Sequence, residues 1–329
     1  PITDLAVKDR HLIAATQGRG FWILDDLSPL YEMDKGFSSE AHLYQPKPSY
    51  LMQSYYGGKS KTAGENHPNG VIINYYLESV DTAKEKYSLN FYDSAGDLVR
   101  SFSSDSESKS NRWIPQAGGQ RFIWNMREAG FEPVEGMILW YVLREGPYAL
   151  PGQYRVEMLI GDKSLKQSFE IVLDPRVSTD ELGLEQQHEY LEEIKLGMAK
   201  MNEVIVEIRA VRKDLNLLAG RCTDSTLLAT IRDYLQQGKE IEEVLHQTKS
   251  RSPQDPLNYP IRLNNKYGHL GALASIGFNA PTASMYAVKE ELELEIKQQI
   301  NAWQAQKEEL KTLNEKLLKS DISLIKWEE

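Results

Sequence analysis

The sequence predicts an α+β protein of two or three domains, and three observations carry that prediction. Short apolar runs alternate with turn signals up to Asp174, as β-strands and hairpins do. At Asp174-Pro175-Arg176 the spacing of apolar residues changes from two to about 3.6, the period of a helix. The 329 residues are 41% hydrophobic, which is enough to build folded cores rather than a disordered chain.

Residues 1–30 contain three short predicted strands, at 4–7, 11–16 and 20–24, with Gly18 and Gly20 as breakers. Three short strands cannot bury both faces of a sheet by themselves. We therefore expect this segment to lean on another part of the chain or on polypeptide outside it.

Residues 31–66 form a predicted connector that is rich in Tyr, Gly and Pro, with strand-like runs at 41–45 and 50–56. Residues 67–175 then hold about seven predicted strands, with hairpin turns at 93–97 and 161–163. Short strands at this spacing predict an immunoglobulin-like β-sandwich. The strands are expected at 71–77, 87–92, 98–102, 120–125, 138–143, 154–160 and 164–173.

Residues 176–329 predict a long, antiparallel, up-and-down helical bundle. Ser178 and Glu181 have the spacing of a capping box, and apolar residues then recur three and four positions apart. Further helices are expected from about 223, over about 261–276 and from about 281. The two longest approach about 40 residues, or about 60 Å, and such helices pack as a bundle. A Pro- and Asn-rich insertion at 249–266 interrupts this bundle.

Charge and composition exclude several classes of partner. Asp and Glu number 48 against 38 Lys and Arg, a net charge of −10, and neither half of the chain is basic. This argues against nucleic acid and against an anionic membrane surface, because both require clustered cations. No apolar run approaches the ~20 residues of a transmembrane helix. The chain starts at Pro1 without an initiator Met or a signal peptide, so we expect it to be part of a longer precursor.

Several runs of sequence resemble the sortilin-like, BNR-repeat propeller proteins of bacteria, which are often labelled glycosyl hydrolases. They are ATQGRGFWILDD at 15–26, PNG at 68–70, GPYALPGQY at 146–154 and QDPLNYPIRLNNK at 254–266. The resemblance implies that 1–30 is the remnant of the last β-propeller blade and that the rest of the propeller lies upstream. It also implies export, to the periplasm, the outer membrane or the medium. It does not imply an enzyme, because related xyloglucanase-type propellers carry their catalytic carboxylates on propeller loops that this chain lacks.

The residues themselves predict no catalytic, cofactor or metal site. The run 57–60, GGKS, looks like the end of a phosphate-binding loop, but Gln53 stands where that loop needs a glycine. The six histidines lack metal-ligand spacing, and Cys222 is the one cysteine. Glu132 and Glu135 are the one loop pair of carboxylates that we single out, and closeness in sequence is a weak basis for the two acids of a glycosidase.

The 249–266 segment is the strongest candidate for binding. Three prolines restrict its backbone, and it exceeds the short turn that a bundle needs. Its polar groups either form an array for a ligand or protein, or cap helix ends and tie the bundle to other domains. On the second reading Asp255 or Asn258 caps the third helix, and an arginine bonds across the bundle. The candidate residues are Arg251, Gln254, Asp255, Asn258, Tyr259, Arg262, Asn264 and Asn265.

Aromatic residues of the β region are a second candidate. They serve either as core and interdomain packing or as a platform on which sugar rings stack. On a strand, adjacent side chains face opposite ways, so one ring of each adjacent pair is expected to point inward. The residues are Tyr55, Tyr56, Tyr75, Tyr76, Trp113, Trp124, Trp140 and Tyr141.

These observations predict a non-catalytic accessory or scaffold region that braces the upstream propeller and presents a surface to a glycan or a protein. The alternative is part of a glycoside hydrolase whose catalytic carboxylates lie in the missing propeller. A third interpretation is a structural helical adaptor, in which the 249–266 segment would be buried against other domains. None of the three requires a cofactor.

Overall fold

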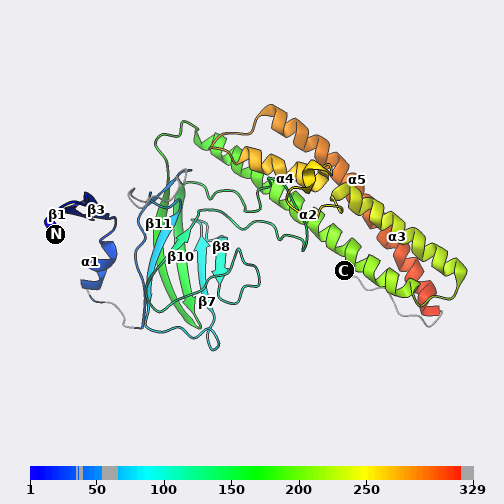
Figure 1. Ribbon diagram of the computed structural model, residues 1–329, viewed down its shortest axis with the longest axis horizontal. Helices are drawn as coiled ribbons and strands as arrows, with labels where there is room; N and C mark the ends of the chain where they lie inside the picture. The colour runs from blue at the N-terminus through cyan, green and yellow to red at the C-terminus, as the bar shows by residue number, and fades with distance from the viewer. Residues whose placement is uncertain (35, 37–39, 54–65, 320–329) are drawn as a thin grey trace. The chain divides into compact units, whose positions relative to one another are not determined.

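The computed structural model describes residues 1–34, 36, 40–53 and 66–319 (Figure 1). The protein is α+β, as predicted, with β-sheets first and a bundle of helices after them. It divides into two compact units. The β unit holds Pro1–Ala129 and Ala149–Val177, and the helical unit holds Gly130–Tyr148 and Ser178–Glu329. Gly130–Tyr148, which the sequence analysis placed within the sandwich at 67–175, thus belongs with the helices.

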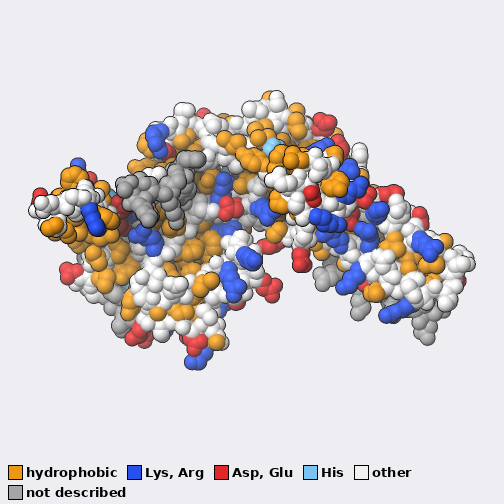
Figure 2. Space-filling view, viewed as in Figure 1, with side chains coloured by type: hydrophobic (Ala, Val, Ile, Leu, Met, Phe, Trp, Pro, Cys, Tyr) orange, Lys and Arg blue, Asp and Glu red, His pale blue; other side chains and the backbone are white. Residues whose placement is uncertain are grey.

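The chain begins with an antiparallel sheet in the order β1-β2-β3, formed by Ile2–Lys8, His11–Thr16 and Phe21–Leu24. Gly20, with a φ of +65°, ends the turn between β2 and β3 in the left-handed region that favours glycine. A short helix that the sequence did not predict, α1 (Ser28–Asp34), follows. All residues of β1 and β3 are exposed, and Figure 2 shows hydrophobic side chains at the surface of this segment.

Two further sheets complete the β unit, in the orders β5-β11-β10-β7-β8 and β4-β6-β9. Neighbouring strands are antiparallel, except that β5 runs parallel to β11. Buried and partly exposed residues alternate along β6, as expected of a strand with one face in a core. The strands are β4 (Ala41–Leu43), β5 (Ser49–Leu51), β6 (Val71–Leu77), β7 (Tyr87–Tyr92), β8 (Leu98–Ser103), β9 (Gly118–Trp124), β10 (Gly152–Ile160) and β11 (Lys163–Leu173).

Aromatic rings from both of these sheets fill the core between them. Trp124 of β9 is fully buried and stacks on Phe91 of β7, with ring centroids 4.4 Å apart. Phe169 of β11 meets Phe91 edge to face, with centroids 6.3 Å apart. Such ring pairs contribute about 0.5–1.5 kcal/mol beyond the area they bury. The two sheets therefore face each other across an aromatic layer.

The helical unit contains α2 (Glu181–Ala219), α3 (Ser225–Leu245), α4 (Leu263–Ala274) and α5 (Ala283–Lys319). α2 and α5 run parallel, because the ion pairs Glu193–Lys289 and Glu207–Lys307 advance in the same direction along both helices. α3 and α4 both run antiparallel to α2, α3 along its C-terminal half and α4 along its N-terminal half. The 249–266 segment thus lies where α3 gives way to α4.

Aspartates begin the first two helices of the bundle. The Oδ1 atom of Asp180 accepts a hydrogen bond of 2.8 Å from the backbone N–H of Gly183, so Asp180 is the N-cap of α2. The predicted capping box of Ser178 and Glu181 is therefore wrong, because the carboxylate of Asp180 takes that position and favours the positive end of the helix dipole. Asp224 caps α3 in the same way.

Glycines allow close packing against α4. A Cβ atom on Gly197 of α2 would lie 2.6 Å from the Tyr267 ring of α4. A Cβ atom on Gly268 of α4 would lie 2.6 Å from the side chain of Val142, which comes from the Gly130–Tyr148 stretch. Real Cβ contacts are wider than this, so both positions depend on glycine to bring their neighbours together.

Candidate functional site

The centre of the 249–266 segment is a turn that Asp255 holds from within. Its Oδ2 atom accepts the backbone N–H of Ser252 at 2.9 Å and that of Arg251, and its Oδ1 atom accepts the Ser252 hydroxyl at 3.0 Å. The two backbone donors hold the pKa of Asp255 below its usual range. The prediction that Asp255 or Asn258 caps the third helix is therefore wrong, because residues that precede Asp255 use its carboxylate and α4 begins without a side-chain cap bond.

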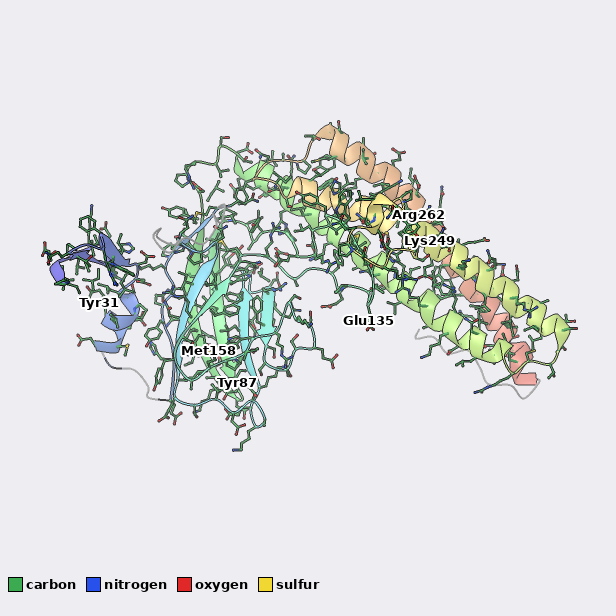
Figure 3. The ribbon with its side chains drawn as sticks, in the orientation of Figure 1. Tyr31, Tyr87, Glu135, Met158, Lys249 and Arg262 are labelled. Atoms are coloured by element: carbon green, nitrogen blue, oxygen red, sulfur yellow. The ribbon has the colours of Figure 1, made fainter. Side chains whose placement is uncertain are left out.

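The other ties of this segment are also local. The guanidinium of Arg251 donates to the carbonyls of Thr248 and Ser250, at 2.9 and 3.1 Å, and not across the bundle as predicted. Gln247 closes the two ends by donating to the carbonyl of Pro260 at 2.8 Å. Figure 3 labels Lys249 and Arg262 at this junction. Arg262 stands at the N-cap position of α4 without a side-chain cap bond, and the remaining exposed candidates are Gln254, Asn258 and Tyr259.

Asn264 and Asn265, the last two candidates, differ from the others because they are buried, with 1% and 4% exposure. Asn265 makes two hydrogen bonds with the backbone of Trp140: it accepts from the N–H at 2.7 Å and donates to the carbonyl at 2.8 Å. The amide nitrogen of Asn264 lies 3.2 Å from Nδ1 of His246 and 3.3 Å from the sulfur of Met137. The structure thus separates these two asparagines from the exposed candidates and directs them to another stretch of chain.

That stretch is Gly130–Tyr148, which we call the strap. The strap forms no strand, so the predicted strand at 138–143 is wrong. Its backbone is held by side chains of α2 as well as α4: Asn202 donates to the carbonyl of Glu132 at 2.7 Å, and Arg209 to that of Glu135 at 3.3 Å. The side chains of both glutamates are exposed. The apolar residues of the strap enter the bundle core, namely Phe131, Val134, Met137, Leu139, Val142 and Leu143.

Arg209, which bonds the strap, also belongs to a buried charge cluster between α2 and α3. Glu242 of α3 is 3% exposed and accepts hydrogen bonds from Arg209, at 2.7 Å, and from Arg212. One turn later His246 is 4% exposed. Burial, and then the neighbouring Arg209 cation, lower the pKa of His246 to about 4. The imidazole is therefore neutral near pH 7, and the ion pairs of Glu242 join α3 to α2.

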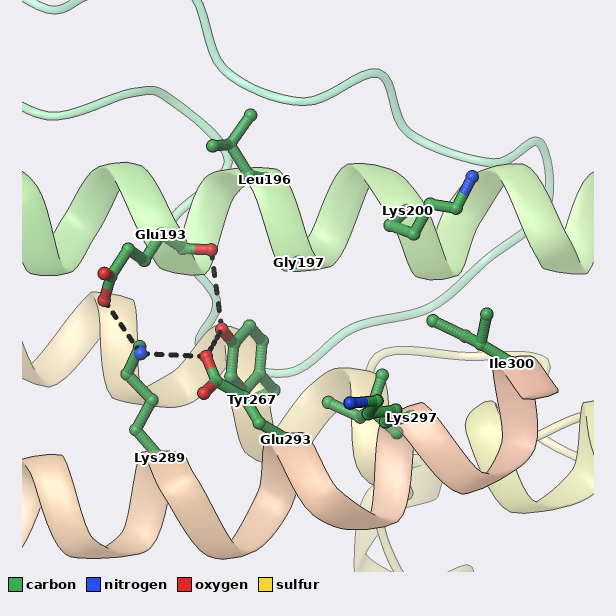
Figure 4. A pocket seen from close by; sticks show the side chains of 10 residues that line it. Glu193, Leu196, Gly197, Lys200, Tyr267, Lys289, Glu293, Lys297 and Ile300 are labelled. Carbon is green, nitrogen blue, oxygen red and sulfur yellow. Dashed lines mark hydrogen bonds and ion pairs between the residues drawn. The ribbon is translucent and has the colours of Figure 1, made fainter.

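A groove of about 420 Å³ lies between α2 and α5 (Figure 4). Leu196, Ile296 and Ile300 are its apolar residues. In the close view Lys200, Lys297 and Ile300 lie toward one end, and the cluster around Lys289 lies toward the other. Its volume is within the range of small-molecule sites, about 300–1,000 Å³, so the state of its charged groups decides what it can do.

The charged end of the groove is fully paired. Lys289 is 2.8 Å from both Glu193 and Glu293, and its side chain is only 9% exposed. Burial opposes the charge of Lys289, but the two carboxylates still raise its pKa. The hydroxyl of Tyr267 donates to Glu293 at 2.7 Å, and burial followed by this contact raises the pKa of Tyr267. Both carboxylates are thus used in joining α2, α4 and α5, which favours a structural role over proton transfer.

The aromatic candidates separate into two groups. Trp113, Trp124 and Tyr75 are at most 3% exposed and belong to the core of the β unit. Tyr76 is partly exposed, so the pair 75–76 alternates as predicted for a strand. Trp140 and Tyr141 are 54% and 58% exposed, and no ring of that pair points inward, because the strap is not a strand. Tyr55, Tyr56 and the run 57–60 lie outside the described residues.

The described ranges show neither a metal cluster nor a membrane-spanning helix. No group of three or more His, Cys, Asp or Glu side chains within them could hold a metal ion. Within the same ranges no helix combines the length and the apolar character of a membrane span. No protein-family model matches the sequence, and no curated protein matches it either.

Proposed function

We propose that this chain is a non-catalytic scaffold region that completes and braces a β-propeller of an exported bacterial protein. The observation that carries the proposal is the β1–β3 sheet, which is apolar on both of its faces. The other two sheets have an aromatic core and the helices have a core of their own, although single apolar side chains stay exposed on both. The β1–β3 sheet has no such core, so it needs cover from elsewhere.

The strand register shows which apolar residues lie on each face of the β1–β3 sheet. Because neighbouring residues of a strand face opposite ways, each row of paired residues lies on one face. The first face carries Leu5, Val7, Leu12, Ala14, Trp22 and Leu24. The second face carries Ala6, Ile13, Ala15, Phe21 and Ile23 at its centre, with Asp4, Lys8 and His11 on the same face. A sheet at the surface of a protein alternates apolar and polar residues, whereas a sheet apolar on both faces is a middle layer.

A propeller blade is such a middle layer, since other blades pack on each of its faces. The run ATQGRGFWILDD at 15–26, which forms β2, its turn and β3, also carries the resemblance to the closing blade of the BNR-repeat propellers. The two facing sheets formed by β4–β11 fit the immunoglobulin-like sandwich proposed from the sequence. The helical unit, with its charges paired across helices, adds a stiff body to this array.

The test measures binding of the full chain to the upstream propeller, produced as a separate polypeptide, by titration calorimetry. We expect Trp22→Thr on one face and Phe21→Thr on the other each to weaken binding at least tenfold, as for buried aromatic anchors. The matched control is Ile114→Thr, which removes a side chain that is 71% exposed in the same unit but outside this sheet. Its affinity should equal that of the unchanged chain. Loss of affinity from only one face would mean that the sheet is an outer layer, and would contradict the blade assignment.

A further inference from the structure

The strap holds its two exposed aromatic rings on a fixed backbone. Asn265, which is buried, bonds both backbone groups of Trp140, at 2.7 and 2.8 Å. Tyr141 has a φ of +51°, a left-handed conformation that is rare and strained for a residue with a large side chain. The ring of His269 supports it: Nδ1 lies 3.0 Å from the Tyr141 carbonyl, and the two ring centroids are 5.3 Å apart. Strained backbone conformations that neighbouring groups hold in place are found at binding sites.

Two cations lie near this histidine on α4. Arg262, Lys266 and His269 are spaced by four and three residues, so they lie on one face of the helix, next to the position of Asn265. Arg262 and Lys266 are exposed, and across the described ranges neither side chain forms an ion pair. The chain as a whole carries a net charge of −10. Two unpaired cations beside two exposed rings are therefore a local reversal of the charge of the protein.

We propose that Trp140, Tyr141, Arg262 and Lys266 form a binding site for an acidic polysaccharide, a chain of uronic acid sugars. The two rings would stack on the apolar faces of sugar rings, and the two cations would pair with the sugar carboxylates. Because a carbonyl lies opposite Nδ1 of His269, that nitrogen carries the proton and Nε2 is an acceptor for a sugar hydroxyl.

The size of the patch favours a glycan over a protein. A stable protein interface covers about 800 Å² on each partner, far more than two exposed rings provide. The exposed strap residues Glu135, Arg144 and Glu145 are charged, so the apolar part of the patch is confined to the two rings, and the cations that would pair with sugar carboxylates are those of α4. Two rings are enough for two neighbouring sugars. This site is independent of the β1–β3 sheet, so it can fail without affecting the proposed scaffold function.

The test titrates the full chain by calorimetry with hexamers of galacturonate, mannuronate and glucuronate, and with the methyl ester of the galacturonate hexamer. We expect at least one acidic hexamer to bind with a Kd below about 1 mM. Trp140→Ala should lower that affinity at least tenfold, and Lys266→Gln should lower it several-fold and reduce its dependence on salt. Tyr50→Ala, which removes a ring that is 54% exposed in the β unit, is the matched control and should change nothing.

Three results would contradict the proposal or its assignment to acidic sugars. Failure of all three acidic hexamers to bind overturns the proposal, as does an unchanged affinity in Trp140→Ala. Equal affinity for the galacturonate hexamer and its ester overturns the assignment to acidic sugars. Circular dichroism checks that each variant is folded, and Lys266→Gln tests the site independently if Trp140→Ala does not fold.

Discussion

The strap and the 249–266 segment are stretches of similar length with little regular structure, but they are held in opposite ways. The 249–266 segment is tied mainly by its own residues, through the Asp255 turn and the carbonyls that Arg251 bonds. The strap is tied by helix residues far away in sequence, namely Asn202 and Arg209 of α2 and Asn265, which is part of α4 although it falls within the 249–266 range. The first is therefore a local feature of the bundle, whereas the second forms only when the bundle has formed.

This difference distinguishes two roles of polar residues, closing their own loop and supporting a distant stretch, which the sequence alone did not distinguish. Polar side chains in an irregular stretch can form hydrogen bonds within their own loop or with a loop that is distant in sequence. Only bonds of the second kind hold the surface of that distant loop in place. Asn264 joins the two regions, because its amide lies beside His246 at the end of α3 and beside Met137 of the strap. Variants of these contacts test whether the two regions are held independently of each other.

The largest effect is expected from Glu242→Ala. It removes the buried partner of Arg209 and Arg212, and loss of one side of a buried ion pair costs about 3–5 kcal/mol. Chemical denaturation measures the loss, and the neighbour Glu243, whose side chain is 37% exposed, is the control. Glu243→Ala should change stability by less than about 0.5 kcal/mol. Equal losses in both variants would contradict the assignment of Glu242 as the central tie.

A second effect comes from pH. The pKa of His246 is about 4 in the folded protein, against about 6.5 in an unfolded chain. The unfolded state therefore binds a proton that the folded state excludes, and stability falls as the pH drops from about 6.5 to about 4. The loss reaches about 3 kcal/mol.

Denaturation curves at several pH values check this, with His246→Gln as the control because glutamine does not titrate. The variant should show a flatter profile in this window. An identical slope in both proteins would assign the pH dependence to other groups. The lowered pKa of Asp174, about 2, acts below this window and does not interfere.

Asn265→Ala tests the strap alone. It removes two part-buried hydrogen bonds to the backbone of Trp140, and we expect a loss of about 1–3 kcal/mol. Hydrogen exchange should accelerate in the strap around 138–142 and stay unchanged at 251–255. Asn258→Ala, at an exposed asparagine, is the control. Faster exchange in both regions would show that the two are not held independently.

The smallest effect is expected from Asp255→Ala, the local counterpart. Loss of its turn should lower the melting temperature by about 1–3 °C, since the segment keeps its closure by Gln247. Exchange should accelerate only at 251–255, while the strap is unaffected. Gln254→Ala serves as the control. An acceleration in the strap would mean that the Asp255 turn positions Asn264 and Asn265, which the structure does not indicate.

Much of the fold could be predicted because its signals are local. Strand alternation located β2, β6 and β7 with their observed bounds, and the helical period located all four helices of the bundle to within a few residues. The strap was misread because the apolar pattern of a buried irregular stretch resembles that of a strand. Its true partners are distant: Asn265 is 125 residues from Trp140.

The candidate site was predicted only in part, because the sequence shows residue types but not their partners. The sequence indicated which residues of the 249–266 segment are polar and that prolines restrict it, but not which way each side chain points. Asp255 accepts hydrogen bonds from residues that precede it rather than from the helix that follows. Asn265 bonds the backbone of Trp140, to which no local sequence pattern connects it. Trp140 and Tyr141 are both exposed because the strap is not a strand, and the positive φ of Tyr141 has no signal in the sequence.

The late closure of the strap has a consequence for synthesis on the ribosome. Phe131 and Val134 are made well before the helices that bury them, and Asn265 emerges 125 residues after Trp140. At about 5–20 residues per second, the newly made strap waits roughly 6–25 s for its partner. During that interval its apolar side chains are open to chaperones and to neighbouring nascent chains. Slow translation between α2 and α4 would lengthen this exposure and favour misassembly.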